Sequence, residues 1–147
     1  MEIDYLIQQA ERFAAYLIAN PLEFVLCHAD IHVGNMLITE QDQLFIVDWD
    51  DTILAPKERD LMFIGAGIGE LWKHEERFWD GYGEVEINPI ALAYYRHERI
   101  IQDIAVTILE YIETDTPDLD ALIWMINAQF TPNGVLDMAR KSAEGIV

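Results

Sequence analysis

Two polar segments beside short hydrophobic runs carry the residues of this sequence that are best suited to chemistry. Residues 28–35 read HADIHVGN, so Asp30 precedes Asn35 with four residues between them. Asp48 directly follows the hydrophobic run 44–47. Kinase active sites use this order: a catalytic-loop Asp, an Asn after four more residues, and a metal-binding Asp after the next strand. Phosphoryl transfer needs a carboxylate that orients the acceptor hydroxyl and takes its proton, together with oxygen ligands for Mg²⁺. The pattern therefore indicates phosphoryl-transfer chemistry.

The hydrophobic runs around these segments predict a β-hairpin. The runs 36–39 and 44–47 are joined by four polar residues, which is typical of two antiparallel strands and their turn. The open end of such a hairpin would place Asn35 beside Asp48, with Asp30 a few residues away on the same loop. We therefore expect these three side chains to meet at one solvent-facing cleft, although they are separated in the sequence.

Most of the remaining sequence has helical periodicity. Apolar residues from Ile3 to Ile18 recur every three or four positions and predict an opening helix, which Asn20-Pro21 ends. Asn88 as cap and Pro89 in the first turn predict a long helix, whose apolar positions continue to Ile112. Further elements are expected as a strand at 24–27, as helices near Arg59, over about 70–79 and after Thr116-Pro117 (with Leu119, Leu122, Ile123, Ile126 and Phe130 inward), and as a short last helix. The predicted fold is one domain, residues 1–147, mainly α with a small β-hairpin.

Composition narrows the classes of function. The sequence contains nine Lys and Arg residues and 27 Asp and Glu residues, so its formal net charge is −18. This charge disfavours nucleic acid as a partner and favours a cationic small molecule. No apolar run approaches the roughly 20 residues of a membrane span, so no membrane partner is expected. The start of the sequence lacks the basic region of a signal peptide, and Cys27 is the only cysteine, so a cytoplasmic setting is expected. Cys27 itself is interpreted as a small buried hydrophobic residue.

The two motifs and their surroundings resemble the aminoglycoside phosphotransferase family. Residues 25–38 resemble its catalytic-loop signature, and residues 46–51 resemble its metal-binding motif. Residues 56–61 resemble the segment that follows, and 93–99 are similar to the spectinomycin-kinase branch. The resemblance covers most of the chain from about Phe24, and the combination of the two loops is highly specific.

The resemblance implies a role for each motif residue. Asp30 would be the catalytic base, and Asn35 and Asp48 would bind Mg²⁺, with ATP as the co-substrate. His28 and Asp60 would support the loop. The candidates for contact with a cationic acceptor, an aminoglycoside-like molecule, are His32, Asp50 and the long-helix residues Glu98, Glu110 and Glu113. The implied fold is the C-terminal lobe of a protein-kinase-like α+β fold.

An N-terminal ATP-binding lobe is missing from this sequence. No glycine-rich loop precedes a strand lysine, since the only lysines are Lys57, Lys73 and Lys141. The glycines at 65, 67 and 69 have the wrong spacing for a phosphate loop and are interpreted as a break between helices. We therefore expect a chain that is incomplete as a kinase, or else a truncated remnant or an assembly module without catalysis. The expected partner is a second copy or a separate N-lobe, docked on apolar residues that include Phe13, Leu17, Ile38 and Phe45.

Two other interpretations of the motifs compete with this one. The strand that ends in Asp48 and is followed by Asp50 and Thr52 resembles the nucleophile motif of haloacid-dehalogenase-type phosphatases. That fold also needs a downstream Ser or Thr, a Lys and α/β alternation, which this sequence lacks. A transition-metal site at His28 and His32, with His74 and His97 in reserve, is disfavoured by Asn35 and its spacing. His97, on the apolar face of the long helix, is interpreted as a hydrogen-bonded core histidine.

Overall fold

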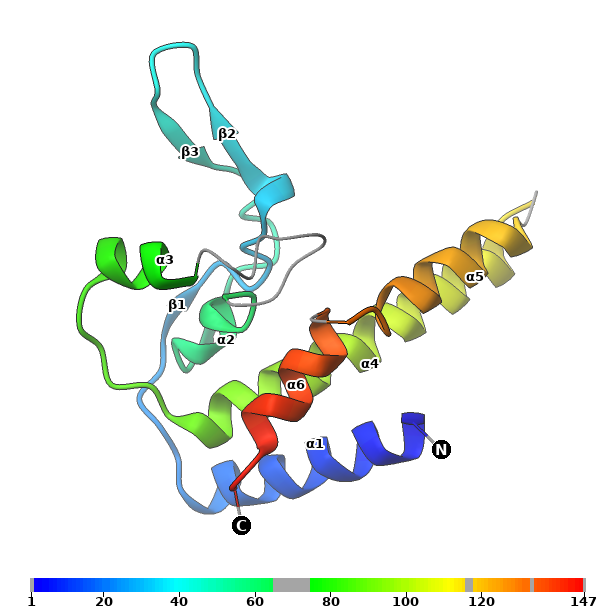
Figure 1. Ribbon diagram of the computed structural model, residues 1–147, viewed down its shortest axis with the longest axis horizontal. Helices are drawn as coiled ribbons and strands as arrows, with labels where there is room; N and C mark the ends of the chain where they lie inside the picture. Colours follow the sequence, from blue (N-terminus) through cyan, green and yellow to red (C-terminus); the bar gives the residue numbers. More distant parts are fainter. Residues whose placement is uncertain (1, 65–74, 116–117, 133, 147) are drawn as a thin grey trace.

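The fold is organised around one long helix. A computed structural model describes residues 2–64, 75–115, 118–132 and 134–146. Helix α4 (Pro89–Glu113) runs through the middle of the molecule, and α1 (Glu2–Ala19) and α6 (Val135–Ala143) pack against its first half (Figure 1). Their shared core consists of Leu6, Ile100, Ile104, Leu136 and Ala139. Within the described residues, no helix is both long enough and apolar enough to cross a membrane.

The start of α4 follows from its sequence as predicted. The Oδ1 atom of Asn88 accepts hydrogen bonds from the backbone N–H groups of Ile90 and Ala91, both at 3.0 Å. Pro89 occupies the first turn, where its missing N–H costs nothing. These local signals fix the end of the helix that lies nearest to the catalytic-loop motif.

The predicted hairpin is confirmed. Strand β2 (Met36–Ile38) pairs antiparallel with β3 (Leu44–Ile46), with Met36 opposite Ile46. In the turn, the hydroxyl of Thr39 accepts hydrogen bonds from the backbone N–H groups of Gln41 and Gln43, both at 3.2 Å. The hairpin projects from the rest of the molecule (Figure 1).

A second antiparallel pair lies below the hairpin. Strand β1 (Val25–Cys27) pairs with β4 (Ile53–Ala55). The sequence predicted β1 but gave no signal for β4, which has only three residues. The β1–β4 pair joins the start of the first motif loop to the end of the second, because β1 precedes the first loop and β4 follows the second.

The helices after β4 differ in detail from expectation. Helix α2 (Glu58–Leu61) begins close to the predicted start at Arg59. Helix α3 (Glu75–Tyr82) extends past the predicted end at Trp79, whereas residues 65–74, including the three spaced glycines, lie outside the described residues. Helix α5 (Leu119–Ala128) begins after Asp118, whose carboxylate caps it by accepting from the N–H of Ala121 at 3.0 Å. The expected start at 116–117 also lies outside the described residues.

The predicted inward face of α5 is wrong in part. Leu119, Ile123 and Phe130 are exposed, as are Ile108, Leu109 and Ile112 in the second half of α4. The reason is that α1 and α6 cover only the first half of α4, and α5 returns alongside the second half as a projecting pair (Figure 1). The expected docking surface is also corrected: Ile38 and Phe45 are exposed, but Phe13 is 1% exposed and belongs to the core.

Candidate active site

The catalytic-loop motif forms a tight turn that ends in a short 3₁₀ helix, η1 (Val33–Asn35). His32 caps it, because its Nδ1 atom accepts a hydrogen bond from the N–H of Gly34 at 3.0 Å. A Cβ atom at position 34 would lie 2.7 Å from the Cε1 atom of the His32 ring, so a larger residue there would displace the ring from its capping position. The turn thus fixes the direction in which Asn35 leaves the loop.

His28 joins the two motif loops from below. Its side chain is buried, its Nε2 atom lies 2.8 Å from the carbonyl oxygen of Val47, and its Nδ1 atom accepts from the N–H of Asp30 at 3.3 Å. The Nε2 atom therefore carries the proton that is donated to Val47. The ring also packs against Trp49, with 4.7 Å between the ring centroids. His28 thus connects the residue before Asp48 to the backbone of Asp30.

Asp60 holds the start of the loop from α2. Its two carboxylate oxygens accept hydrogen bonds from the N–H groups of His28 at 2.9 Å and Ala29 at 2.8 Å. Ala29 has a φ of 70°, a conformation that a residue with a Cβ rarely adopts. The carboxylate offsets the cost of this backbone conformation, because charged acceptors make stronger hydrogen bonds than neutral ones.

Asp30 and Asn35 are hydrogen-bonded at the open end of the hairpin, and Asp48 follows β3 at the same end. The Nδ2 atom of Asn35 donates to the carbonyl oxygen of Asp30 at 2.9 Å and lies 3.5 Å from its Oδ2 atom. The N–H of Val47 donates to the carbonyl oxygen of Asn35 at 3.0 Å, which continues the ladder of the hairpin by one residue. Asp48 therefore follows the residue directly bonded to Asn35. Asn35 is buried, Asp30 is partly exposed and Asp48 is exposed.

The structure adds two residues that the sequence did not single out for a role. Arg99, on α4, donates from Nη1 to the Oδ1 atom of Asp30 at 2.5 Å. Its Nε atom lies 2.7 Å from Oδ1 of Asp103, one helical turn later. Burial raises the pKa of Asp103, and the neighbouring Arg99 opposes that rise. The i, i+4 spacing of Arg99 and Asp103 is visible in the sequence, but the contact of Arg99 with Asp30 is not.

The expected acceptor-contact residues occupy different places. The Nε2 atom of His32 lies 3.4 Å from the Oδ2 atom of Asp30, whereas Asp50 is exposed in the turn after Trp49. Glu98 accepts a hydrogen bond from the hydroxyl of Tyr94 at 2.9 Å, and Tyr94 lines an apolar groove between α1 and α4 rather than the catalytic loop. Glu110 and Glu113 are exposed on the projecting part of α4. Of the expected set, His32 is the residue in contact with Asp30.

The competing interpretations of the motifs lose support. Both ring nitrogens of His28 already have backbone partners, and the described residues hold no group of three or more His, Cys, Asp or Glu side chains placed to bind a metal. The strand before Asp48 lies in a two-stranded antiparallel hairpin, not in the α/β arrangement of a haloacid-dehalogenase-type phosphatase. His97 is buried, as predicted, but only its Nδ1 atom has a hydrogen-bond partner among the described residues.

Comparison with known proteins identifies the family of this chain. Residues 2–92 match the model of the phosphotransferase enzyme family, APH. The crystal structure of spectinomycin phosphotransferase APH(9)-Ia in complex with ADP and spectinomycin is 38% identical, with a TM-score of 0.82 over 96% of this chain and 44% of that one. The AMP-bound complex of the same enzyme is also 38% identical, with a TM-score of 0.76 over 95% of this chain and 44% of that one. This chain thus spans less than half the length of these solved relatives. With the family model matching more than half of its residues, the chain belongs to the phosphotransferase enzyme family.

Proposed function

We propose that this chain forms the catalytic lobe of a small-molecule kinase that transfers the γ-phosphoryl group of ATP to a hydroxyl of a spectinomycin-like acceptor. The hydrogen bond between Asn35 and Asp30, with the backbone pairing that brings the residue before Asp48 to Asn35, carries this proposal. The family match supports the reaction class, and the ADP and spectinomycin in the solved relative support the choice of nucleotide and acceptor. The net charge of −18 suits a cationic acceptor.

The residues at the hairpin end fit a magnesium ion. Mg²⁺ prefers carboxylate and amide oxygens, and Asn35 and Asp48 supply one of each. Because the Nδ2 atom of Asn35 donates to Asp30, its Oδ1 atom is directed to the opposite side of the amide group. Within the described part of the chain, neither this oxygen nor the Asp48 carboxylate accepts a hydrogen bond, so both are available as ligands. When bound, the ion would neutralise charge on the nucleotide phosphates.

Asp30 is the base in this proposal. Its carboxylate is partly exposed, so an acceptor hydroxyl has access to it. The proton of that hydroxyl passes to Asp30 as the hydroxyl oxygen bonds to the γ-phosphorus. In the same displacement, the bond between the γ-phosphorus and the β,γ-bridging oxygen of ATP breaks, and that oxygen leaves as part of ADP. His28 and Asp60 hold the loop in place without touching the reacting atoms.

The proposed catalytic lobe needs a second lobe that binds the nucleotide. Positioning and electrostatic stabilisation of the phosphates supply most of the rate in this chemistry, and the solved relatives are more than twice as long as this chain. We therefore expect weak binding of Mg-ATP and little phosphorylation by the chain alone. A separately supplied ATP-binding lobe of a relative should raise both.

The experiment combines calorimetry with product detection. Mg-ATP is titrated into the chain with and without the supplied lobe, and phosphorylated spectinomycin is measured by mass spectrometry. Asp30→Asn should lower the rate by about 100-fold or more, because a positioned base contributes that much. Asp80→Asn is the matched control: it is an exposed carboxylate on α3, outside both motifs, and should leave the rate within about threefold. Equal rates for Asp30→Asn and wild type, or no product with the lobe present, would contradict the proposal.

A further inference from the structure

We propose that Arg99 is a positioning residue for phosphoryl transfer, because its guanidinium fixes one carboxylate oxygen of Asp30 and leaves the other for the acceptor hydroxyl. This inference rests on the proposed function. It starts from the 2.5 Å contact between Nη1 of Arg99 and Oδ1 of Asp30, which joins residues 69 positions apart. Charge-assisted hydrogen bonds are roughly twice as strong as those between neutral groups.

Arg99 is itself held from two sides. Its Nε atom lies 2.7 Å from a carboxylate oxygen of Asp103 in an ion pair without hydrogen-bond geometry, so two carboxylates flank the guanidinium. The guanidinium also lies over the ring of Phe63, at 5.2 Å from the ring centroid. Its side chain is 23% exposed, which limits the number of other orientations open to it. A side chain restrained in this way can transmit a fixed orientation to Asp30.

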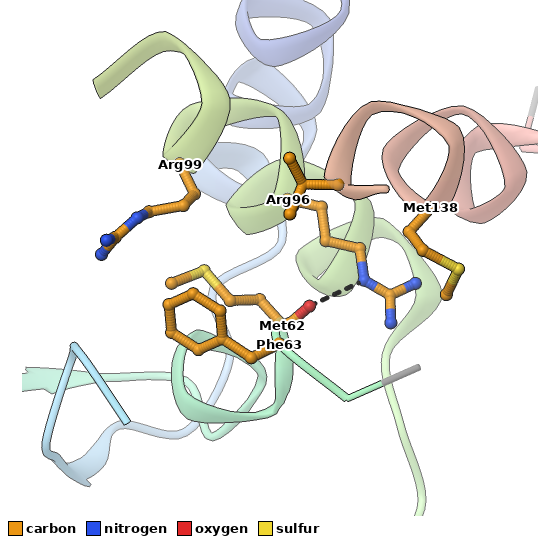
Figure 2. Close-up of a pocket in the computed structure, with 6 residues that line it drawn as sticks. Met62, Phe63, Arg96, Arg99 and Met138 are labelled. Atoms are coloured by element: carbon orange, nitrogen blue, oxygen red, sulfur yellow. Dashed lines mark hydrogen bonds between the residues drawn. The ribbon is translucent and has the colours of Figure 1, made fainter. Parts of the chain in front are cut away.

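Helix α4 also holds the backbone on both sides of Phe63 in place. Arg96, three residues before Arg99, is buried and donates to the carbonyl oxygens of Met62 at 3.0 Å and Ile64 at 2.6 Å. Figure 2 shows the two arginines leaving α4 in different directions, with Arg96 bonded to Met62 and Arg99 on the side of Phe63. Helix α4 thus fixes the segment that carries Phe63 and, through Arg99, the carboxylate of Asp30.

The remaining contacts of Asp30 divide its two oxygens. Oδ1 is paired with Arg99, whereas Oδ2 has only longer contacts, 3.4 Å to Nε2 of His32 and 3.5 Å to Nδ2 of Asn35. Oδ2 is therefore the oxygen that is open to a new hydrogen bond from an acceptor. With Oδ1 fixed, rotation of the carboxylate that would exchange the two oxygens requires breaking the contact with Arg99. The assigned role is orientation of the base, with no contact between Arg99 and the reacting atoms.

If Arg99 had a purely structural role and only linked α4 to the catalytic loop, its substitution would have different effects. If Arg99 only held the loop to the helix, its removal would loosen the whole loop, including Ala29 and its hydrogen bond to Asp60. If it positions Asp30, its removal would change the surroundings of the Asp30 carboxylate while Ala29 stays bonded. Lysine keeps the charge but lacks the planar fork, so it should restore the orientation only in part.

The first measurement is NMR on the full chain. Arg99→Gln should displace the Asp30 side-chain ¹³Cγ resonance and leave the Ala29 amide resonance in place. Arg99→Lys should give a smaller displacement, and Asp103→Asn should move the resonance through its effect on Arg99. Arg77→Gln, an exposed arginine on α3, is the matched control and should change neither signal. An unchanged Asp30 resonance in Arg99→Gln, or the joint loss of the Asp30 and Ala29 signals, would overturn the inference.

The second measurement is the lobe-supplemented phosphorylation assay. We expect Arg99→Gln to lower kcat about 10- to 100-fold with KM for spectinomycin within about threefold, since a displaced catalytic group costs rate rather than binding. Arg99→Lys should recover part of kcat. An active wild type together with an equally active Arg99→Gln overturns this inference alone. A wild type that forms no product overturns the proposed function, and the catalytic meaning of Arg99 with it.

Discussion

Asp60 and His28 lie 32 positions apart in the sequence, yet the Oδ2 atom of Asp60 accepts the backbone N–H of His28 at 2.9 Å. The other carboxylate oxygen accepts the next N–H, that of Ala29. One side chain on α2 thus satisfies two consecutive backbone donors at the bottom of the catalytic loop. This relationship makes the loop conformation dependent on a residue outside the loop, which yields the first prediction.

Asp60→Asn should destabilise the protein by about 1–3 kcal/mol, because one amide oxygen replaces two charged acceptors and the new NH₂ group faces a backbone donor. The change in free energy of unfolding is measured by urea denaturation. Hydrogen exchange at the His28 and Ala29 amides should accelerate more than exchange in α4. Asp51→Asn, on an exposed loop, serves as control and should stay within about 0.5 kcal/mol of wild type. Unchanged exchange at both amides in Asp60→Asn would refute the anchoring role.

We expect the folded chain to lose stability in mild acid because of His97. The ring is fully buried between α1 and α4, edge-on to Phe13, and its Nε2 atom has no partner among the described residues. Burial lowers the pKa of His97 below its ordinary value of 6.5, and the nearby charge of Arg12 lowers it further, whereas the hydrogen bond to Ala93 opposes the shift. The stability that the neutral His97 ring contributes is therefore fully present above about pH 6.5. It is lost as the pH falls, because the unfolded chain takes up a proton that the folded chain excludes.

The test compares melting temperatures at pH 7.5 and pH 5.5. Wild type should lose more stability over this range than His97→Phe or His97→Leu, which remove the titrating group from the core. The difference for one group is bounded at about 1.4 kcal/mol per pH unit. The two apolar variants distinguish a packing defect from the effect of the proton, since a defect lowers stability equally at both pH values. Parallel pH profiles for wild type and both variants would rule out a role for His97 in acid sensitivity.

Local signals in the sequence predict the hairpin and the start of α4. They do not predict contacts between residues that are far apart along the chain. The two hydrophobic runs at 36–39 and 44–47 with their polar turn, and the Asn88-Pro89 cap, are short-range features, so each predicts its element without information about distant residues. The pairing of β4 with β1 and the contact of Arg99 with Asp30 connect residues far apart, and nothing local marks them. Helical periodicity likewise showed which face of α5 is apolar but not whether another element covers it.

The thiol of Cys27 should be inert in the folded chain. It is buried, and its Sγ atom lies 3.6 Å from the carbonyl oxygens of Ala55 and Pro56. Burial, with a smaller contribution from the negative charge of Asp60, raises the pKa of Cys27 to about 11. At pH 8 only about one thiol in a thousand is then the reactive thiolate.

A disulfide reagent such as Ellman's reagent should therefore label Cys27 slowly in buffer and rapidly in denaturing urea. The labelling rate in buffer should follow unfolding rather than reagent concentration once the reagent is in excess. A short peptide that contains residues 24–30 provides the control for an unprotected thiol. Labelling of the native chain as fast as the peptide would contradict the buried, neutral state.

The last prediction is that the chain self-associates through the projecting part of α4 and α5, more strongly as salt increases. Ile112 is 69% exposed and Trp124 is 68% exposed, and Leu109, Leu119 and Ile123 on the same two helices are also exposed. Apolar patches of more than a few hundred Å² are uncommon on soluble monomers, and burial of about 800 Å² per partner makes an ordinary stable interface. The net charge of −18 opposes association at low salt, whereas screening shortens the range of this repulsion from about 10 Å at 0.1 M to about 3 Å at 1 M. Sedimentation equilibrium across this salt range should show a mass that rises with salt. Trp124→Ser should weaken the association, whereas Ile18→Ser, at an 82% exposed position on α1, should not. A chain that stays monomeric at tens of micromolar throughout the series would show that this surface does not bind a second copy.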